Sequence, residues 1–432
     1  MKIILSIPII SLTIFSSLGF TTPPTDSPFA PPSPSLSGQI RTRTEYDQKA
    51  MRDTSANKAF FNTQIRSRLG FTAAPSPQIG IKLEVQDTRF MGSEPPIPAT
   101  NPAASSVGNN KGIDLLQGYA TVTEGAFTAA IGRQKMSLGA GRFLSTLEWS
   151  PTSRAFDGFS FNCNAEPGNL TGLVYLVRDS AEKATVDRLL LTGLYYNRKL
   201  TSLHQGDIFI FYDQSRLAST YGGLTAQNYD LIYVGERLAG KFGSFVYEEE
   251  FIWQGGEFRS GRDLTSAAFQ LSTRFGSVFG PHKMNLGVDI LSGDDDPSDN
   301  EVSTYRANYY FAHAYYGWMD YFTANPKFGV IDLRIDGDFA FLPGASGTPR
   351  VSVKPQYHNF LPQKAPSSSD EPYGQEFDLE VNLAIYPKAN IVLGGGIFLP
   401  SDGAAILPAA ALGPNQDYKP GFALYLMPTF NF

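Results

Sequence analysis

The chain has 432 residues, a formal net charge of −6 and an unusual balance of side chains, with 13% aromatic but only 18% charged residues. Soluble domains carry roughly 25% charged residues, and a helical membrane span needs about 18 consecutive apolar residues, which no segment after the N-terminus approaches. Helical membrane proteins are therefore excluded. Two classes remain open, a barrel whose strands face lipid and an ordinary soluble array of β-sheets.

The N-terminal residues indicate export. Met1 and Lys2 give a short basic start, residues 3–18 are mostly apolar, and Ser17 and Gly19 are small. This pattern predicts a signal peptide over residues 1–19 and Sec-type export. Residues 20–37 are rich in proline and serine and lack hydrophobic periodicity, so we expect a disordered leader. The folded part is predicted to span residues 38–432.

From residue 38 onward, apolar and polar side chains alternate with a period of two. Residues 39–46, 61–71 and 78–87 each place apolar side chains on one face of a strand and charged side chains on the other. Similar segments recur to the C-terminus, and we count 16 to 19 of them, depending on how the Tyr- and Phe-rich residues 304–322 are divided. Single-chain bacterial barrels have even strand numbers. The sequence therefore predicts an all-β protein, a transmembrane antiparallel β-barrel with 18 strands, or 16 as the alternative.

The C-terminal segment supports closure of the barrel and a place in the bacterial outer membrane. It alternates up to a terminal aromatic residue, Phe432, and so resembles the signal that outer-membrane barrels present to their assembly machinery. Closure also removes the exposed edges that so long a sheet would otherwise have. Longer polar or Gly/Pro-rich connections are expected as loops at residues 89–112, 292–300, 361–374 and 401–418.

Motifs for covalent chemistry are missing, so the sequence predicts no enzyme and no cofactor. Gly139 and Gly141 open a glycine-rich stretch, but Leu144 takes the place of the third glycine of a dinucleotide-binding loop, and no helix is expected after it. The four histidines are scattered without metal-ligand spacing. The single cysteine, Cys163, lies in an apolar segment and is expected to be buried and inert.

One acidic stretch raises the question of a metal site. Asp294, Asp295, Asp296 and Asp299 could bind a divalent cation through carboxylate oxygens. They lack the spacing and central glycine of an EF-hand loop, and a solvated acidic loop is the favoured interpretation.

Charge is distributed unevenly along the chain. Residues 41–160 carry 14 basic and 10 acidic residues, whereas the rest of the chain carries 21 basic and 31 acidic residues. Arg41, Arg43, Arg66 and Arg68 lie on the polar faces of their strands, which would line the lumen of a barrel because charges facing lipid are costly. Basic side chains inside a pore favour anions. Alternatively, these arginines pair with carboxylates of Glu45, Glu84, Glu248 or Glu250 and brace the barrel wall, and the sequence leaves both interpretations open.

Three blocks of sequence resemble a known family. The first holds Gly132-Arg133-Gln134, Leu138-Gly139-Ala140-Gly141-Arg142 and the run from Trp149 to Gly158; the second holds residues 292–300 followed by 315–320; the third is residues 374–380. In this order they are similar to motifs of the alginate export proteins. The resemblance implies an 18-stranded outer-membrane barrel with a narrow, arginine-rich pore that passes alginate. By the matching motif positions, the resemblance implies that the candidate residues at the constriction are Arg133, Gln134, Arg142, Arg154 and Asp157.

We therefore expect an anion-selective outer-membrane channel for an alginate-like polysaccharide or for smaller anionic solutes. The alternative is a non-specific porin, or a structural barrel that transports nothing. Expected partners are outer-membrane lipid and lipopolysaccharide, the barrel assembly machinery, an anionic sugar or polymer substrate, and periplasmic export proteins. Nucleic acid is not expected.

Overall fold

A computed structural model describes most of the chain. The described residues are 35–49, 60–91, 113–180, 187–216, 219–221, 224–226, 228–259, 263–296, 298–306, 308–343, 349–364, 371–407 and 419–432. The expected signal peptide and nearly all of the expected leader lie outside them. The first strand begins at Ser35, ahead of the expected start at Gly38, because residues 35–37 already pair with residues 70–72.

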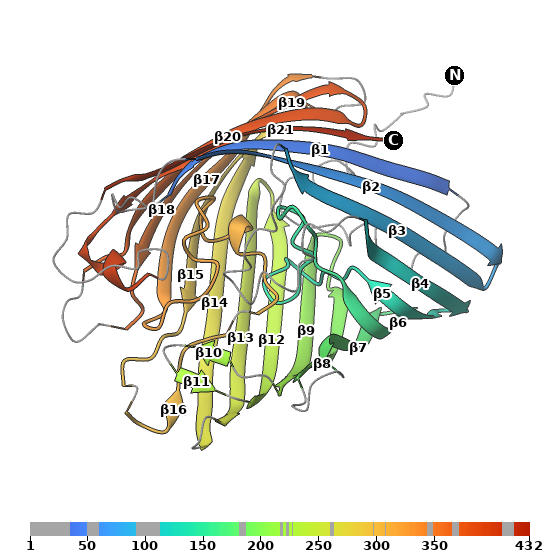
Figure 1. Cartoon of the computed structure of the whole chain (residues 1–432), viewed down its shortest axis with the longest axis horizontal. Coiled ribbons are helices and arrows are strands. Elements are labelled where there is room, and N and C mark those ends of the chain that lie inside the picture. The colour runs from blue at the N-terminus through green and yellow to red at the C-terminus, as the bar shows by residue number, and fades with distance from the viewer. Residues whose placement is uncertain are drawn as a thin grey trace, which may run out of the picture.

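Eighteen antiparallel strands of the described residues form one closed barrel (Figure 1). The first nine are β1 (Ser35–Gln48), β2 (Phe60–Ser76), β3 (Ile79–Phe90), β4 (Asp114–Glu124), β5 (Phe127–Gln134), β6 (Phe156–Ala165), β7 (Gly168–Ser180), β8 (Asp187–Lys199) and β9 (His204–Ser215). The other nine are β12 (Asn228–Phe242), β13 (Phe245–Arg259), β14 (Asp263–Phe279), β15 (His282–Leu291), β17 (Val330–Pro343), β18 (Pro349–Leu361), β19 (Gly374–Tyr386), β20 (Ala389–Pro400) and β21 (Gly421–Asn431).

Smaller elements lie in the connections. The short strands β10 (Ser219–Tyr221) and β11 (Leu224–Ala226) pair with each other, and β16 (Glu301–Val302) runs parallel to β14. The helical elements of the described residues are the 3-10 turns η2 (Ala312–Ala314) and η4 (Asp402–Ile406). No helix in the described part of the chain is long and apolar enough to cross a membrane.

The first and last strands close the barrel. β1 pairs with β2 on one side and with β21 on the other, and Figure 1 shows β1 and β21 side by side. Gly38 and Phe432 exchange two backbone hydrogen bonds of 3.1 and 3.0 Å. Every strand of the barrel thus has a neighbour on both sides, which leaves no open edge. The prediction of 18 strands is confirmed, and the alternative of 16 is wrong.

The period-two pattern decides which side chains face outward. On β3, Ile79, Ile81 and Leu83 are exposed on the outer face, whereas on the neighbouring strand Arg66 and Arg68 point inward and are buried. The same apolar outer face continues around the barrel through exposed aliphatic side chains such as those of β9 and β15. Because strand side chains alternate strictly, the four strand arginines expected to face the lumen do so.

The connections differ at the two ends of the barrel. The turns after β2, β4, β6, β12, β14 and β19 each contain two residues and lie at the end that holds both chain termini. All four long connections expected from the sequence leave strands at the opposite end. Barrels of the outer membrane have short periplasmic turns and longer extracellular loops, which identifies the long-loop end as the extracellular one.

Candidate channel constriction

Two loops from the long-loop end fold into the barrel instead of extending away from it. Loop A is residues 135–155, between β5 and β6, and loop B is the described part of residues 303–329, before β17. They meet inside through a β-bridge between Leu144 and Tyr309. The amide of Ser145 donates to the carbonyl of Tyr309 at 2.9 Å, and the amide of Phe311 donates to the carbonyl of Gly141 at 3.1 Å. The loops are therefore joined to each other across the interior.

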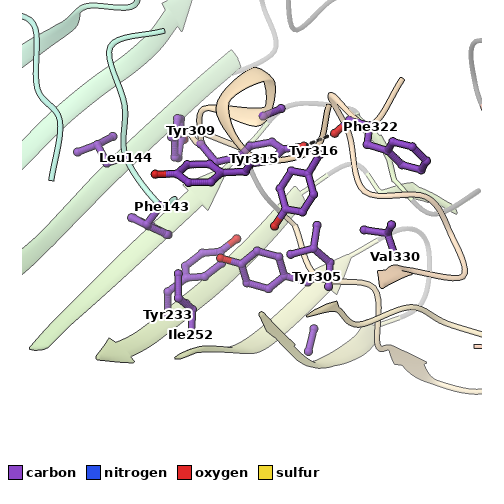
Figure 2. Packing of buried hydrophobic residues seen from close by; sticks show 14 of the residues in the cluster. Phe143, Leu144, Tyr233, Ile252, Tyr305, Tyr309, Tyr315, Tyr316, Phe322 and Val330 are labelled. Carbon is purple, nitrogen blue, oxygen red and sulfur yellow. Dashed lines mark hydrogen bonds between the residues drawn. The ribbon is translucent and has the colours of Figure 1, made fainter. Parts of the chain in front are cut away.

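An aromatic core holds both loops inside. Figure 2 shows Phe143 and Leu144 of loop A beside the tyrosines of loop B and the side chains of Tyr233 and Ile252. The rings of Phe143 and Phe211 lie 4.6 Å apart, and those of Phe322 and Phe360 lie 4.1 Å apart. Burial of rings of this size is strongly favourable. The sequence left residues 304–322 as possible strand, but their described part, 304–306 and 308–322, is a loop whose aromatic side chains pack in this core.

The backbone of loop A is held by arginines from the wall formed by β1 and β2. Arg41 donates to the carbonyls of Glu148 and Ser150 at 2.8 and 2.9 Å, and Arg66 donates to the carbonyl of Glu148 at 3.0 Å. Arg43 donates to the carbonyl of Trp149 at 2.7 Å and lies 4.3 Å from the centre of its indole ring. Guanidinium groups supply several donors in a fixed geometry, which suits a loop that presents consecutive carbonyls.

The side chain of Glu148 reaches the same group of cations. Its carboxylate lies 2.7 Å from Arg68, 3.5 Å from Arg66 and 3.1 Å from Lys135. Burial favours the protonated acid, but these three cations outweigh it and hold the pKa of Glu148 below its usual range. Together, Arg41, Arg43, Arg66, Arg68 and Lys135 form what we call the basic cluster.

Loop B is held by groups of the opposite charge. Glu376 and Asp378, neighbours on the inner face of β19, accept hydrogen bonds from the amides of Met319 and Trp318 at 2.8 and 3.2 Å. Arginines thus bind the carbonyls of loop A, and carboxylates bind the amides of loop B. The loops also touch here, because the indole of Trp149 stacks on His313 with ring centres 3.9 Å apart.

Of the residues expected at the constriction, Arg142, Arg154 and Gln134 lie inside the barrel. Arg142 is 2% exposed, pairs with Asp289 at 3.0 Å and lies 3.8 Å from the ring centre of Tyr315. Burial opposes its charge, but Asp289 raises the pKa of Arg142 above its ordinary value. Arg154 donates to the carbonyls of Ser145 and Tyr309, and burial lowers its pKa to about 10. Both arginines hold loops A and B in place.

Gln134 is fully buried on the inner face of β5. Its side-chain oxygen accepts hydrogen bonds from Ser160 at 2.6 Å and from Tyr175 at 3.3 Å, and its amide nitrogen lies 3.3 Å from the carbonyl of Gly158. These contacts satisfy the polar end of the side chain within the protein. Gln134 therefore fixes the point at which loop A leaves the wall.

Arg133 and Asp157 do not line the lumen, so the prediction that they lie at the constriction is wrong. They are paired across β5 and β6, form an ion pair at 2.8 Å, and lie on the outer face together with Ile131 and Phe159. The reason is the strand period, since their neighbours Gln134 and Phe156 point inward. The side chains of adjacent motif residues thus lie on opposite faces of the barrel wall.

Two glycines let β5 and β6 pack closely where loop A begins. Gly132 and Gly158 are opposite each other, with φ of 129° and 154°. A Cβ on Gly132 would lie 2.2 Å from the carbonyl oxygen of Gly118, and the same φ is strained for any other residue.

We expect Gly132→Ala to destabilise the barrel by about 1–3 kcal/mol, measured as a lower temperature of unfolding on heat-modifiability gels. Gly206→Ala is the control, because its Cβ would meet only the flexible side chain of Leu200, at 3.2 Å; equal losses would contradict the steric explanation.

The carboxylates considered as braces have mixed roles. Glu45 pairs with Arg43 at 2.9 Å, and Glu84 lies 3.9 Å from Lys135. Glu248 pairs with Arg237, on the opposite side of the lumen from the basic cluster. The pairing of a strand arginine with one of these carboxylates is thus confirmed for Arg43 and Glu45, and the preference for anions stays a prediction.

The acidic stretch forms turns in the described residues. The carboxylates of Asp294, Asp296 and Asp299 each accept a hydrogen bond from the amide two residues further on, at 3.0, 2.9 and 2.9 Å, and Asp295 lies 3.5 Å from Lys364. Across the described part of the chain, no group of three His, Cys, Asp or Glu side chains could hold a metal ion. Asp295, Asp296 and Asp299 are exposed, as in a solvated loop, whereas Asp294 is buried.

Sequence reasoning missed several residues that shape this site. Lys135 directly follows one segment of the first resembling block, Glu148 directly precedes another and Trp149 begins it, but none of the three was named as a candidate. Glu376 and Asp378 lie in the third block, two positions apart, which is the spacing that places side chains on one face of a strand. That spacing was the available signal for an inward carboxylate pair.

A closed 18-stranded barrel with an apolar outer face and loops folded into its lumen defines a porin-like channel of the outer membrane. The sequence matches the model of the family described as alginate export over residues 34–326. The chain belongs to the alginate export family, as its motifs predicted. A comparison with curated proteins finds none that matches the sequence.

Solved structures of similar fold are outer-membrane porins. A BenF-like porin from Pseudomonas fluorescens Pf-5 has a TM-score of 0.64 and 11% identity, with 93% of this chain and 99% of that chain covered. OccAB4 of Acinetobacter baumannii has a TM-score of 0.63 and 10% identity, with 94% and 100% covered. OccK2 of Pseudomonas aeruginosa, solved in complex with glucuronate, has a TM-score of 0.60 and 12% identity, with 93% and 98% covered. At these identities the likeness concerns the fold.

Proposed function

We propose that the barrel is a passive channel that favours anionic sugars, of which uronates are the class that fits best. The observation that carries this proposal is the basic cluster. Among the described residues, the carboxylates of Glu45, Glu84 and Glu148 lie within 4.0 Å of its five cations. The cluster gathers positive charge on one side of the lumen beside loop A, and rings or patches of basic side chains favour anions.

Passage through such a channel requires no covalent step. Positive charge in a confined lumen raises the local concentration of anions, and guanidinium groups recognise carboxylates through paired donors. Loops A and B, joined through Leu144 and Tyr309, narrow the route from the extracellular side. We favour small anionic sugars over a polymer as the solute, because both loops are fixed to the wall and to each other by many contacts.

Glucuronate is the probe of choice. It carries the carboxylate and hydroxyl groups of a uronate polymer in a single ring, and OccK2 has been solved with it. Membership of the alginate export family supports the same chemical class. Block by an alginate oligomer can then be compared with block by the glucuronate monomer in the same channel.

We expect the purified protein to conduct in planar bilayers with a permeability for chloride roughly fivefold above that for potassium, the factor that about 1 kcal/mol of screened charge interaction allows. The measurement is the reversal potential in a salt gradient, followed by block with glucuronate, with glucose as the neutral control. Preference should fall at high salt, because screening shortens the range of the field. Cation preference would contradict the proposal. An absence of conductance would favour the structural-barrel alternative, and equal permeabilities would favour the non-specific porin.

A further inference from the structure

We propose that Arg66, Arg68 and Lys135 form a carboxylate subsite in the lumen, and that the side chain of Glu148 occupies it until a solute carboxylate takes its place. This inference rests on the proposed anion preference. It adds a named binding site and an internal competitor, so that Glu148 sets how tightly the channel binds its solute.

The contacts around Glu148 have the form of a bound carboxylate ligand. One oxygen lies 2.7 Å from Arg68 and 3.5 Å from Arg66, and the other lies 3.1 Å from Lys135. Both oxygens are thus bound by cations, as the oxygens of a uronate would be. The carboxylate of Glu148 thus faces three cations, of which Lys135 also lies 3.9 Å from Glu84.

Exposure differs sharply between the two sides of this contact. The side chains of Arg66, Arg68 and Lys135 are 4%, 6% and 4% exposed, whereas that of Glu148 is 40% exposed. Glu148 is therefore the most water-accessible group of this contact, and a solute carboxylate would approach the three cations from its side.

The cations remain in position without the carboxylate of Glu148. Arg66 donates to the side-chain oxygen of Gln39 at 3.1 and 2.6 Å, and Arg68 donates to that of Gln86 at 2.8 Å. The backbone amide of Lys135 is fixed by Gln117 at 3.1 Å. A binding site whose donors are held in advance loses less entropy when its ligand arrives.

Loop A also stays in place when the side chain of Glu148 moves. The carbonyl of Glu148 is bound by Arg41 and Arg66, and the neighbouring carbonyls of Trp149 and Ser150 are bound by Arg41 and Arg43. Only rotations about side-chain bonds are needed to withdraw the carboxylate. Exchange of one carboxylate for another therefore leaves the constriction intact.

The test measures block of single-channel current by glucuronate in Glu148→Gln, Glu148→Asp and wild-type protein. Glutamine keeps the shape but removes the competing charge, and we expect block at a concentration about two- to fivefold lower than in wild type, as expected for loss of one partly exposed charge pair. Aspartate keeps the charge but shortens its reach, so block should also tighten, by less than in Glu148→Gln.

Glu45→Gln is the matched control, because Glu45 is another partly exposed carboxylate of the same wall but pairs with Arg43. It should shift ion selectivity through charge alone and change glucuronate block much less than Glu148→Gln. Equal block in Glu148→Gln and wild type, or equal changes in Glu148→Gln and Glu45→Gln, would overturn the subsite while leaving an anion channel. A cation-selective wild-type channel that glucuronate does not block would instead overturn the proposed function. If Glu148→Gln does not fold, Glu148→Asp decides alone, and block unchanged from wild type counts against the subsite.

Discussion

Replacing Arg66 and Arg68 together by glutamine is expected to abolish the preference for anions. The basic cluster would fall from five cations to three, which equals the number of carboxylates of the described residues that lie within 4.0 Å of it. Much of the positive charge on this side of the lumen would then be lost. We expect the reversal potential to approach zero and glucuronate to block at a concentration more than about tenfold higher, since two charge-assisted contacts are each worth about 1.5 kcal/mol or more.

The loss should arise in the lumen and not from the overall charge of the protein. Arg133→Gln is the control, because this arginine pairs with Asp157 on the outer face of the barrel. It removes a positive charge without touching the basic cluster, and both selectivity and block should stay as in wild type. A shift in Arg133→Gln would point to a long-range effect of net charge. Unchanged selectivity in the double variant would mean that Arg66 and Arg68 serve only to hold loop A.

The strands were predictable because their signal is local. Alternation along residues 39–46 and 61–71 specifies both the strand and the face that each arginine occupies. Closure followed from the number of such segments and the aromatic C-terminus, and the pairing of β1 with β21 confirms it. The same alternation, applied from Ile131 through Gln134, would have placed Arg133 on the outer face. The prediction that Arg133 lines the lumen rested instead on the resemblance to a family motif.

The constriction was not predictable to the same degree, because its contacts join distant parts of the chain. Leu144 meets Tyr309, and Arg41 binds the carbonyl of Glu148, although more than a hundred residues separate each pair. Aromatic residues of loop B are dense enough to imitate strand composition, and only the core in which they pack shows otherwise. The motif identified which loop matters, but side-chain partners such as Lys135 and Glu148 depend on the folded loop.

A second large effect is expected from Arg142→Met, which should destabilise the packing of loop A by about 3–5 kcal/mol. Arg142 and Asp289 are each 2% exposed and lie 3.0 Å apart, and Arg334 is 3.9 Å from the same carboxylate. Methionine fills most of the volume of the arginine side chain. Asp289 then stays buried, and the more distant Arg334 balances its charge less well. We expect unfolding at a lower denaturant concentration and a larger, noisier single-channel conductance, because loop A would leave its position more often.

The double variant Arg142→Met/Asp289→Asn separates charge from packing. Removing both charges avoids the unpaired buried carboxylate, and replacement of a buried ion pair by uncharged groups of similar volume is often nearly neutral. The stability and the low-noise single-channel conductance of wild type should therefore be restored to a large extent in the double variant. If it is as unstable as Arg142→Met alone, the role of Arg142 lies in its contact with the ring of Tyr315, 3.8 Å away, and not in the ion pair. Recovery would show that the loss in Arg142→Met comes from the unpaired buried charge of Asp289 and not from packing.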